Sequence, residues 1–234
     1  MRYYNIVILG GSGGIGKAII QVLIQSHINI INIDKHSANI NSKYYTEILR
    51  DLKPENVNEV CQIISERFKS IDGFISVIGY YGVNTLDTFS YEEYMNTLNI
   101  NVSIPTLFGI YLLKKMKEEN KGKMIFVSSA AAYIGSRDIS YSISKSAILG
   151  LVKGLSKSLA GLNIYIYGVA PGIVKTSMSK NMSVSRQNDA IMNTINKRMC
   201  EPIEIAKLVR FILIEDDGYM NGTIVHINDG LYLN

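Results

Sequence analysis

Short apolar runs alternate along the chain with segments whose apolar residues recur at helical spacing. The first run, Ile6–Leu9, ends in glycine, and Ile15, Ile19, Val22 and Leu23 then follow on one helical face. Further runs that predict strands are Ile28–Ile33, Tyr44–Ile48, Phe74–Ile78, Lys123–Ser128, Ile164–Val169 and Thr223–Ile227. The pattern predicts about seven strands, with helices between most of them.

Sequence patterns that predict helices lie between the later predicted strands. Ser90 with Glu93 has the form of a capping box, and a helix is predicted over Val102–Lys117 with Pro105 in its first turn. Two more helices are predicted, over Tyr141–Leu159 and from Glu201 through the apolar face of Ile205, Leu208, Val209 and Ile212. This alternation predicts an α/β fold, a three-layer, Rossmann-type, doubly wound parallel sheet, as a single domain over residues 1–234.

Composition narrows the functional classes. The chain of 234 residues carries 24 basic and 20 acidic side chains, scattered without a basic run, so no nucleic-acid partner is expected. Three histidines lack metal-ligand spacing, which predicts no metal site. Cys61 and Cys200 form no CxxC pair and are expected as reduced thiols. The apolar run at the N-terminus is too short for a signal peptide or a membrane span, so a cytoplasmic protein is expected.

One segment differs in texture from the rest. Residues 176–200 are polar, rich in Ser, Asn, Met and Lys, and follow the carboxyl end of a predicted strand. Ligands bind at that edge of open α/β sheets, so this segment is predicted to be a substrate-binding loop or lid. The other interpretation is a surface loop that has no role in binding.

The first strand leads into a glycine-rich loop, Gly10–Gly16. Glycines let the backbone approach a ligand closely, and the helix that follows offers free N–H groups to a pyrophosphate. Asp34 ends the second strand, where a carboxylate can accept hydrogen bonds from an adenosine ribose. The loop is therefore predicted to bind a dinucleotide.

The same loop also matches the GxSxG nucleophile elbow of hydrolases, with Ser12 as the nucleophile. A hydrolase would need a later histidine, and only His226 is suitably placed. The elbow would also fall on the first strand and leave Gly14-Ile15-Gly16 without a role, so this interpretation is the weaker one.

Tyr141 and Lys145 are four residues apart and share one face of a predicted helix. A neighbouring ammonium favours a phenolate, so Lys145 is expected to lower the pKa of Tyr141 and fit it for proton exchange with an alcohol or carbonyl. Ser128 and Ser129, at the end of the strand before this helix, could hold the substrate oxygen.

These motifs, in their order and spacing, resemble those of the short-chain dehydrogenase/reductase family over nearly the whole chain. Leu9–Gly16 resembles the TGxxxGIG loop with Leu9 in place of threonine, and Tyr141 and Lys145 match YxxxK. The resemblance implies an NAD(P)-dependent oxidoreductase that interconverts a carbonyl and an alcohol. Its implied catalytic residues are Asn101, Ser129, Tyr141 and Lys145.

The resemblance also implies a role for each of these four. Tyr141 is the general acid–base, and Lys145 lowers its pKa and binds the nicotinamide ribose. Ser129 orients the carbonyl, with Ser128 as the alternative. Asn101 supports a water-linked proton path to Lys145. Asn99 is the alternative to Asn101.

Further motifs imply cofactor contacts. Asp51-Leu52 resembles the pair placed against the adenine, and Pro171–Thr176 resembles the PGxxxT turn at the nicotinamide. Ser76–Gly79 stands where the family has NNAG and keeps only the glycine. The expected contacts are Gly10, Ser12, Gly14, Ile15, Gly16, Asp34, Asp51, Leu52, Gly79, Tyr141, Lys145, Pro171, Val174 and Thr176.

The ligands are predicted in part. Asp34 would repel a 2′-phosphate, which favours NAD, while the adjacent Lys35 keeps NADP open. The substrate is expected to be a small carbonyl or alcohol, either a sugar derivative or a 3-oxoacyl thioester. Tyr80, Tyr81, Tyr133 and the segment Met178–Met199 are expected near it.

Two further expectations concern assembly and activity. The family usually forms dimers or tetramers through long helices, so a homo-oligomer is expected, for which Ile148, Leu151, Val152 and Leu155 are available unless they belong to the core. The rival to an enzyme is a catalytically inactive dinucleotide-binding regulator, favoured only by the missing NNAG asparagines.

Overall fold

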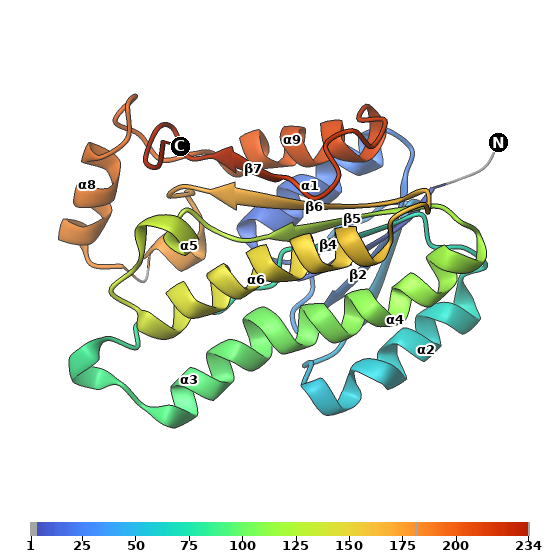
Figure 1. The fold of residues 1–234 in the computed structure, drawn as a ribbon, viewed down its shortest axis with the longest axis horizontal. Helices are drawn as coiled ribbons and strands as arrows, with labels where there is room; N and C mark the ends of the chain where they lie inside the picture. The colour runs from blue at the N-terminus through green and yellow to red at the C-terminus, as the bar shows by residue number, and fades with distance from the viewer. Residues whose placement is uncertain (1–3, 181, 234) are drawn as a thin grey trace.

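The chain folds around one parallel sheet of seven strands in the order β3-β2-β1-β4-β5-β6-β7 (Figure 1). The computed structural model describes residues 4–180 and 182–233, so residues 1–3 and 234 of the predicted domain lie outside it. The strands are β1 (Asn5–Leu9), β2 (Asn29–Asp34), β3 (Tyr45–Leu49), β4 (Gly73–Ser76), β5 (Gly122–Val127), β6 (Ile164–Pro171) and β7 (Ile224–Ile227). Each predicted strand is present, which confirms the predicted sheet.

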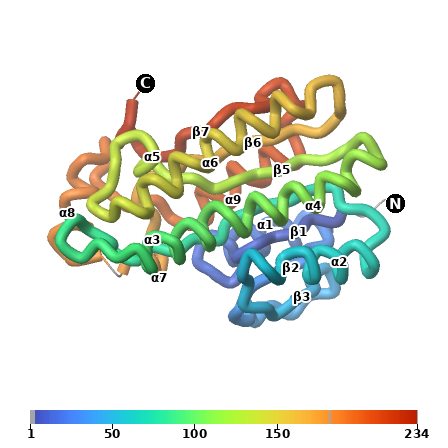
Figure 2. Tube along the Cα trace, turned by 60° about the horizontal axis from the view of Figure 1, so that its bottom comes forward, coloured from blue at the N-terminus to red at the C-terminus, as the bar shows by residue number. Residues whose placement is uncertain are grey.

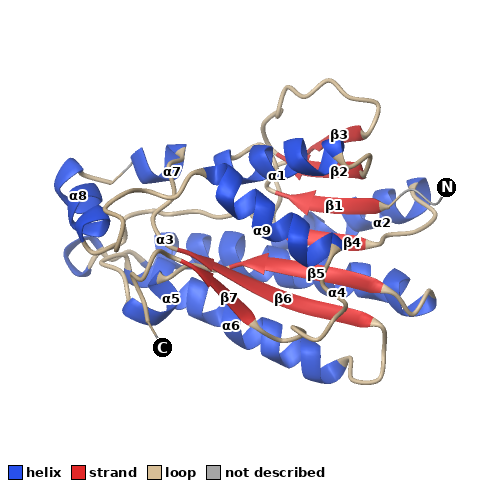
Figure 3. Cartoon of the chain, turned by 90° about the horizontal axis from the view of Figure 1, so that it is seen from above, coloured by secondary structure: helices blue, strands red, loops and turns tan. Residues whose placement is uncertain are grey.

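Helices cover both faces of the sheet and form three layers (Figures 1 and 3). One face carries α1 (Gly14–Gln25) and α9 (Pro202–Ile214), which pack against each other. The other carries α2 (Val57–Arg67), α4 (Ile104–Glu118) and α6 (Ile139–Ser158). The sequence analysis missed α2, although its buried residues Val57, Val60, Cys61 and Ile64 have helical spacing.

Two apolar clusters fill the spaces between these layers. On the face of α2, α4 and α6, the ring of Phe74 lies between Phe108 and Phe126, with centroid distances of 5.9 and 5.7 Å. On the other face, residues such as Ile8, Ile19 and Val209 are fully buried. Burial on both faces explains why the strands are nearly continuous apolar runs.

The helices predicted separately after Ser90 and after Val102 form one nearly continuous rod. Ser90 caps α3 (Tyr91–Leu98) by accepting a hydrogen bond from Glu93 N at 3.4 Å, which is one half of the predicted capping box. The other half is absent, because Ser90 N donates to Asn84 Oδ1. A π-helical segment, η3 (Asn99–Ser103), then joins α3 to α4. Pro105 lies in the first turn of α4. Single π-helical turns of this kind are frequent at functional sites.

The carboxyl ends of the strands meet at one end of the molecule. The strand order reverses between β1 and β4, and ligands of such sheets bind at that reversal. Three short helices gather at the same end: α5 (Ala131–Ile134), α7 (Ser177–Lys180) and α8 (Val184–Met192) (Figure 2). The last two belong to the segment 176–200, in which residue 181 lies outside the described residues.

The remaining elements are two short 3₁₀ turns, η1 (Pro54–Asn56) and η2 (Leu86–Thr88). Over residues 4–180 and 182–233, no helix has the length and apolar content needed to cross a bilayer.

Candidate active site

The glycine loop after β1 forms a cradle made of backbone. Gly10 adopts a φ of +89°, and a Cβ there would lie 2.6 Å from the backbone of Ile78 on β4. A Cβ on Gly16 would lie 2.5 Å from the carbonyl oxygen of Gly10. Within the described residues, α1 has neither a side-chain cap at Gly13 nor an acidic residue in its first turn. Its first N–H groups are therefore free for an anionic ligand.

A buried amide supports this loop from behind. Asn32 is fully buried on β2, and its Oδ1 accepts a hydrogen bond from Gly11 N at 2.9 Å. Its Nδ2 donates to the hydroxyl of Tyr45 at 2.9 Å, and that hydroxyl donates to Glu47 Oε1 at 2.6 Å. A Cβ on Gly11 would overlap Asn32 Oδ1. Asn32 was not predicted, although an amide near the end of the apolar run Ile28–Ile33 was a usable signal.

Replacing Asn32 with leucine is expected to weaken dinucleotide binding about tenfold and leave kcat nearly unchanged. The substitution leaves Gly11 N–H and the Tyr45 hydroxyl without partners, at about 1–3 kcal/mol each in unfolding free energy. Fluorescence titration and urea unfolding measure the two effects. Asn29→Leu is the control, because Asn29 lies on the same strand as Asn32 but donates to Asn5 Oδ1 on β1, away from the loop. Equal loss of binding in both variants would contradict the role given to Asn32.

Asp34 ties the glycine loop to the loop after β2. Ser12 N donates to Asp34 Oδ2 and His36 N donates to Asp34 Oδ1, each at 3.0 Å. The Ser12 hydroxyl donates to the carbonyl oxygen of His36 at 2.6 Å. The carboxylate therefore shapes the loop and also lines the cleft beside it.

The cleft next to the loop has a volume of about 430 Å³ and contains most of the expected dinucleotide contacts. Those lining it are Gly10, Ser12, Gly14, Ile15, Gly16, Asp34, Asp51, Leu52, Gly79 and Thr176. The expected contacts that do not line it are Tyr141, Lys145, Pro171 and Val174, which line the adjoining cavity. His36 and Arg50 also line the cleft and were not predicted.

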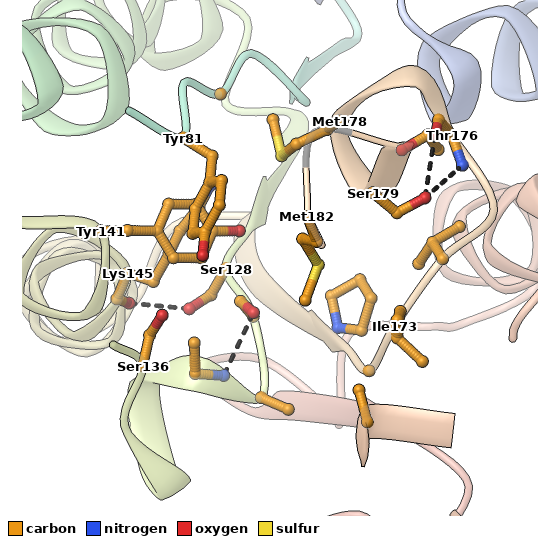
Figure 4. Close-up of a pocket in the computed structure, with 18 of the residues that line it drawn as sticks. Tyr81, Ser128, Ser136, Tyr141, Lys145, Ile173, Thr176, Met178, Ser179 and Met182 are labelled. Atoms are coloured by element: carbon orange, nitrogen blue, oxygen red, sulfur yellow. Dashed lines mark hydrogen bonds between the residues drawn. The ribbon is translucent and has the colours of Figure 1, made fainter. Parts of the chain in front are cut away.

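The adjoining cavity has a volume of about 400 Å³ and shares Ile15, Gly79, Thr176 and Met178, among others, with the cleft. Its wall brings together Ser128, Ser129, Tyr141 and Lys145 (Figure 4). The two spaces thus meet at the predicted catalytic residues. A ligand in the cleft and a second ligand in the cavity would contact each other there.

The two serines after β5 have different surroundings. Ser128 is buried, and its hydroxyl donates to the carbonyl oxygen of Lys145 at 2.7 Å. The Ser129 hydroxyl accepts from Ala131 N at 3.1 Å and bonds the hydroxyl of Tyr141. The hydroxyl of Ser128 is used inside the fold, so the geometry favours Ser129 over Ser128 as the group facing a substrate.

Tyr141 lies in the first turn of α6, where Asp138 caps the helix and accepts from Tyr141 N at 2.9 Å. Burial raises the pKa of the Tyr141 phenol to about 12, although the hydrogen bond with Ser129 acts in the opposite direction. This differs from the sequence-based expectation that Lys145 lowers the pKa. The Lys145 ammonium lies 5.6 Å from the ring centre of Tyr141, and the loss of solvation outweighs its effect.

Lys145 is buried one turn further along α6. Burial lowers the pKa of its amine from 10.5 to about 8. Its Nζ donates to the carbonyl oxygen of Val127 at 3.1 Å. A Cβ on Gly79 would lie 3.6 Å from this Nζ, which is an ordinary contact distance, so the glycine retained from the NNAG pattern borders the lysine head.

Asn101 lies in η3 and holds a backbone loop. Its Oδ1 accepts from Tyr80 N at 2.7 Å, and its Nδ2 donates to Tyr80 O and to the hydroxyl of Ser144, both at 2.9 Å. It lines neither space, so its side chain positions the loop after β4 instead of facing the cavity. Asn99 opens the same π-helical segment.

The segment 176–200 lies over the cavity. Met178, Met182 and Arg186 line it, and Figure 4 shows both methionines across the cavity from Tyr141. Tyr80 lines the cleft and Tyr81 the cavity, as expected. Tyr133 lines neither, which is a correction: its ring stacks on Tyr232 and meets His226, with both centroid distances 4.6 Å.

The four apolar residues of α6 considered for oligomer contacts differ in burial. Ile148 and Val152 are buried in the core, so the core interpretation holds for them, while Leu151 and Leu155 are half-buried against the core and keep both interpretations open. The large apolar side chains that are exposed on α4 and α6 are Leu107, Ile110 and Ile143.

A doubly wound parallel sheet with a glycine cradle after its first strand defines an α/β protein of the dinucleotide-binding class. The profile of the family described as "Enoyl-(Acyl carrier protein) reductase", adh_short_C2, matches residues 12–232. The chain therefore belongs to the short-chain dehydrogenase/reductase family, and it is an NAD(P)-dependent oxidoreductase of that family.

Individual relatives agree with this assignment. The 3-oxoacyl-[acyl-carrier-protein] reductase FabG of Buchnera aphidicola subsp. Schizaphis graminum is 29% identical, over 97% of this chain and 96% of the relative. A solved short chain dehydrogenase family protein from Francisella tularensis is 27% identical, with a TM-score of 0.86 over 98% of this chain and 99% of that one. ElxO, solved with NADP bound, shares the fold at 22% identity and a TM-score of 0.89, over 98% of this chain and 99% of that one.

Proposed function

We propose that this protein reduces a carbonyl to an alcohol at Tyr141, with a dinucleotide in the cleft and the substrate in the adjoining cavity. The observation that carries the proposal is the meeting of the two spaces at Ser129, Tyr141 and Lys145. Among curated relatives, the 3-oxoacyl-[acyl-carrier-protein] reductase of Buchnera aphidicola is named for the reduction of a carbonyl group.

The described residues fit a nicotinamide dinucleotide. The cradle of Gly10, Gly14 and Gly16 at the start of α1 suits a pyrophosphate, because added side chains would fill it. Asp34 suits the adenosine ribose, and Lys145 with the Pro171–Thr176 turn suits the nicotinamide end. When bound, the reduced dinucleotide supplies the hydride.

The chain itself supplies the proton and the orientation. A phenol with a pKa raised to about 12 is protonated at neutral pH, so Tyr141 can donate its proton to the carbonyl oxygen. The hydroxyl of Ser129 bonds that of Tyr141 and can hold the same oxygen in line. Hydride and proton together convert the carbonyl to an alcohol.

A direct test is to follow the absorbance of the reduced dinucleotide with a panel of carbonyl compounds, including 3-oxoacyl thioesters and sugar derivatives. Turnover of any member supports the enzyme. No turnover with the whole panel, together with tight dinucleotide binding, would favour the rival hypothesis of an inactive regulator.

We infer that NAD is the preferred dinucleotide. The carboxylate of Asp34 faces the cleft at the end of β2, where it would repel a 2′-phosphate. NADP is the second candidate, because Lys35 and Arg50 line the same cleft and ElxO was solved with NADP bound.

The wild-type protein is expected to bind NADH about tenfold more tightly than NADPH. Asp34→Asn should narrow that difference, because it removes the charge and keeps the shape. Titrations that follow energy transfer from protein tyrosines to the reduced nicotinamide measure both constants. Tighter binding of NADPH by the wild type would show that Lys35 and Arg50 outweigh the carboxylate.

We also propose that the protein forms a homodimer or homotetramer. The exposed apolar residues Leu107, Ile110 and Ile143 on α4 and α6 support this, because apolar surface of this kind is buried in stable assemblies. Sedimentation equilibrium tests it by measuring the mass in solution, and a monomer at all concentrations would contradict it.

A further inference from the structure

Tyr81 stands next to the catalytic tyrosine and has a hydroxyl without a partner. It follows β4 and lines the cavity, and its ring meets that of Tyr141 edge to face with a centroid distance of 5.2 Å and an interplanar angle of 87° (Figure 4). Its hydroxyl is buried and makes no hydrogen bond to any described residue. Buried polar groups in native proteins nearly always have partners, so this hydroxyl lacks one that a ligand can supply.

A guanidinium lies over the same ring. Arg186, in the first turn of α8, has its guanidinium carbon 5.8 Å from the ring centre of Tyr81, and it lines the cavity. It forms no ion pair with any carboxylate of residues 4–180 or 182–233. A half-buried cation that forms no ion pair favours the binding of an anion beside it.

A second arginine lines the cavity from another part of the chain. Arg137 precedes α6, near the short helix α5, and also lacks an ion-pair partner among the described residues. The acidic residue of the lining is Asp189, on α8. The charged groups that line the cavity, besides Lys145, are therefore two arginines and one carboxylate, and their balance is positive.

The rest of the lining is largely apolar. Ile134, Ile173, Met178, Met182 and Leu231 form walls that offer no charge to a substrate. Positive charge and an unpaired hydroxyl donor meet at Tyr81 and Arg186, and Arg137 adds a second positive charge to the same lining. Such a distribution fits a ligand with an apolar body and one anionic group, and it fits a neutral polyol poorly.

We propose that Tyr81, Arg186 and Arg137 form an anion-binding subsite, and that the substrates are carbonyl compounds carrying a carboxylate or a phosphate. The proposal rests on the proposed reductase function. Tyr81 donates a hydrogen bond to the anion, and the two arginines pair with its charge. These residues position the substrate so that its carbonyl meets Tyr141. None of them exchanges a proton with the reacting carbon or oxygen.

The test compares substrates that differ only in charge. One arm uses 3-oxo acids and their methyl esters of equal chain length. The other uses short ketones that carry a phosphate, such as hydroxyacetone phosphate, and their neutral O-methyl analogues. The anionic member of at least one pair is expected to have a kcat/KM about tenfold higher, mainly through KM, which corresponds to about 1.4 kcal/mol. If the anionic member has the higher kcat/KM in only one arm, that arm identifies the anion as a carboxylate or a phosphate.

Three variants test which residues cause the preference for anionic substrates. Arg186→Gln and Arg137→Gln should each reduce the ratio of anionic to neutral kcat/KM severalfold. Tyr81→Phe should reduce it less, because it removes a hydrogen bond but keeps the ring against Tyr141. Lys180→Gln is the matched control, since Lys180 is an exposed cation of α7 outside the lining. An unchanged ratio in both arginine variants, or an equal loss in the control, would overturn the proposal.

A second readout does not require turnover. In the presence of reduced dinucleotide, octanoate or octyl phosphate is expected to raise Tm more than methyl octanoate, and Arg186→Gln should remove that difference. If no carbonyl is reduced but this difference exists, the reductase function fails while the anion subsite stands. If carbonyls are reduced but neither anion is preferred in Tm or kcat/KM, the subsite fails while the reductase function stands.

Discussion

Tyr141→Phe is expected to lower kcat by about 10²–10⁴-fold and to leave the dinucleotide Kd within about twofold, because general acid catalysis contributes an effect of that size. The variant removes the hydroxyl that bonds Ser129 and keeps the ring that packs against Tyr81. The cofactor cleft is lined by other residues and should be unchanged. Steady-state kinetics and a dinucleotide titration measure the two quantities.

Tyr133→Phe provides the matched control. Tyr133 belongs to α5, close in sequence to Tyr141, but its ring packs on Tyr232 and His226 and does not line the cavity. Its kcat should stay within about twofold of the wild type. If Tyr141→Phe retained the wild-type kcat, proton donation by Tyr141 would be wrong and another group would have to serve.

Lys145→Met is expected to abolish turnover and to stabilise the protein without cofactor at pH 7. A pKa lowered by burial from 10.5 to about 8 means that burying the ammonium costs about 3 kcal/mol of folding free energy. Methionine fills similar space without charge, and it loses the bond to Val127 O, which is worth about 1 kcal/mol. The net gain in unfolding free energy is about 2 kcal/mol.

The sign of the pH dependence follows from proton binding. Below pH 8 the lysine is protonated in both the folded and the unfolded state, so the folded wild type is destabilised by the full cost of burying the ammonium. Between pH 8 and 10.5 the unfolded chain binds more protons than the folded one, so wild-type stability rises with pH and the advantage of the variant disappears. Urea unfolding at several pH values measures this. Lys153→Met, at an exposed position of α6, should show no such change, and a less stable Lys145→Met protein at pH 7 would contradict the argument.

Most of the fold and the location of the site could be predicted from the sequence, because each depends on local patterns. Apolar runs that end in Gly10, Asp34 and Gly79 mark strand ends, and parallel strands bring those ends to one edge. The glycine loop and the pair Tyr141 and Lys145 have fixed spacings within single elements. Such features need no knowledge of the packing.

The rest depends on contacts between distant segments. Asn32 meets Gly11 only because β1 and β2 are neighbours in the sheet, and Arg186 meets Tyr81 only because α8 lies over the loop after β4. The pKa of Tyr141 could not be predicted from the spacing to Lys145, because the burial of both groups decides its direction. Tyr133 was placed wrongly for the same reason, since its partners Tyr232 and His226 come from the C-terminal part of the chain.

The π-helical segment η3 limits the effect that a change in chain length would have at this point of the fold. Its wider turn holds one residue more than an ordinary helical turn would, and Asn101 lies within it. Deleting one residue between Asn99 and Ser103 would convert the wide turn into a regular helical turn and leave α4 in its place, because the wide turn absorbs the extra residue. The loss would be local: Asn101 would leave Tyr80, while Phe108 would stay beside Phe74. Related chains that are one residue shorter in η3 should therefore keep the core and lose the support that Asn101 gives to the loop after β4.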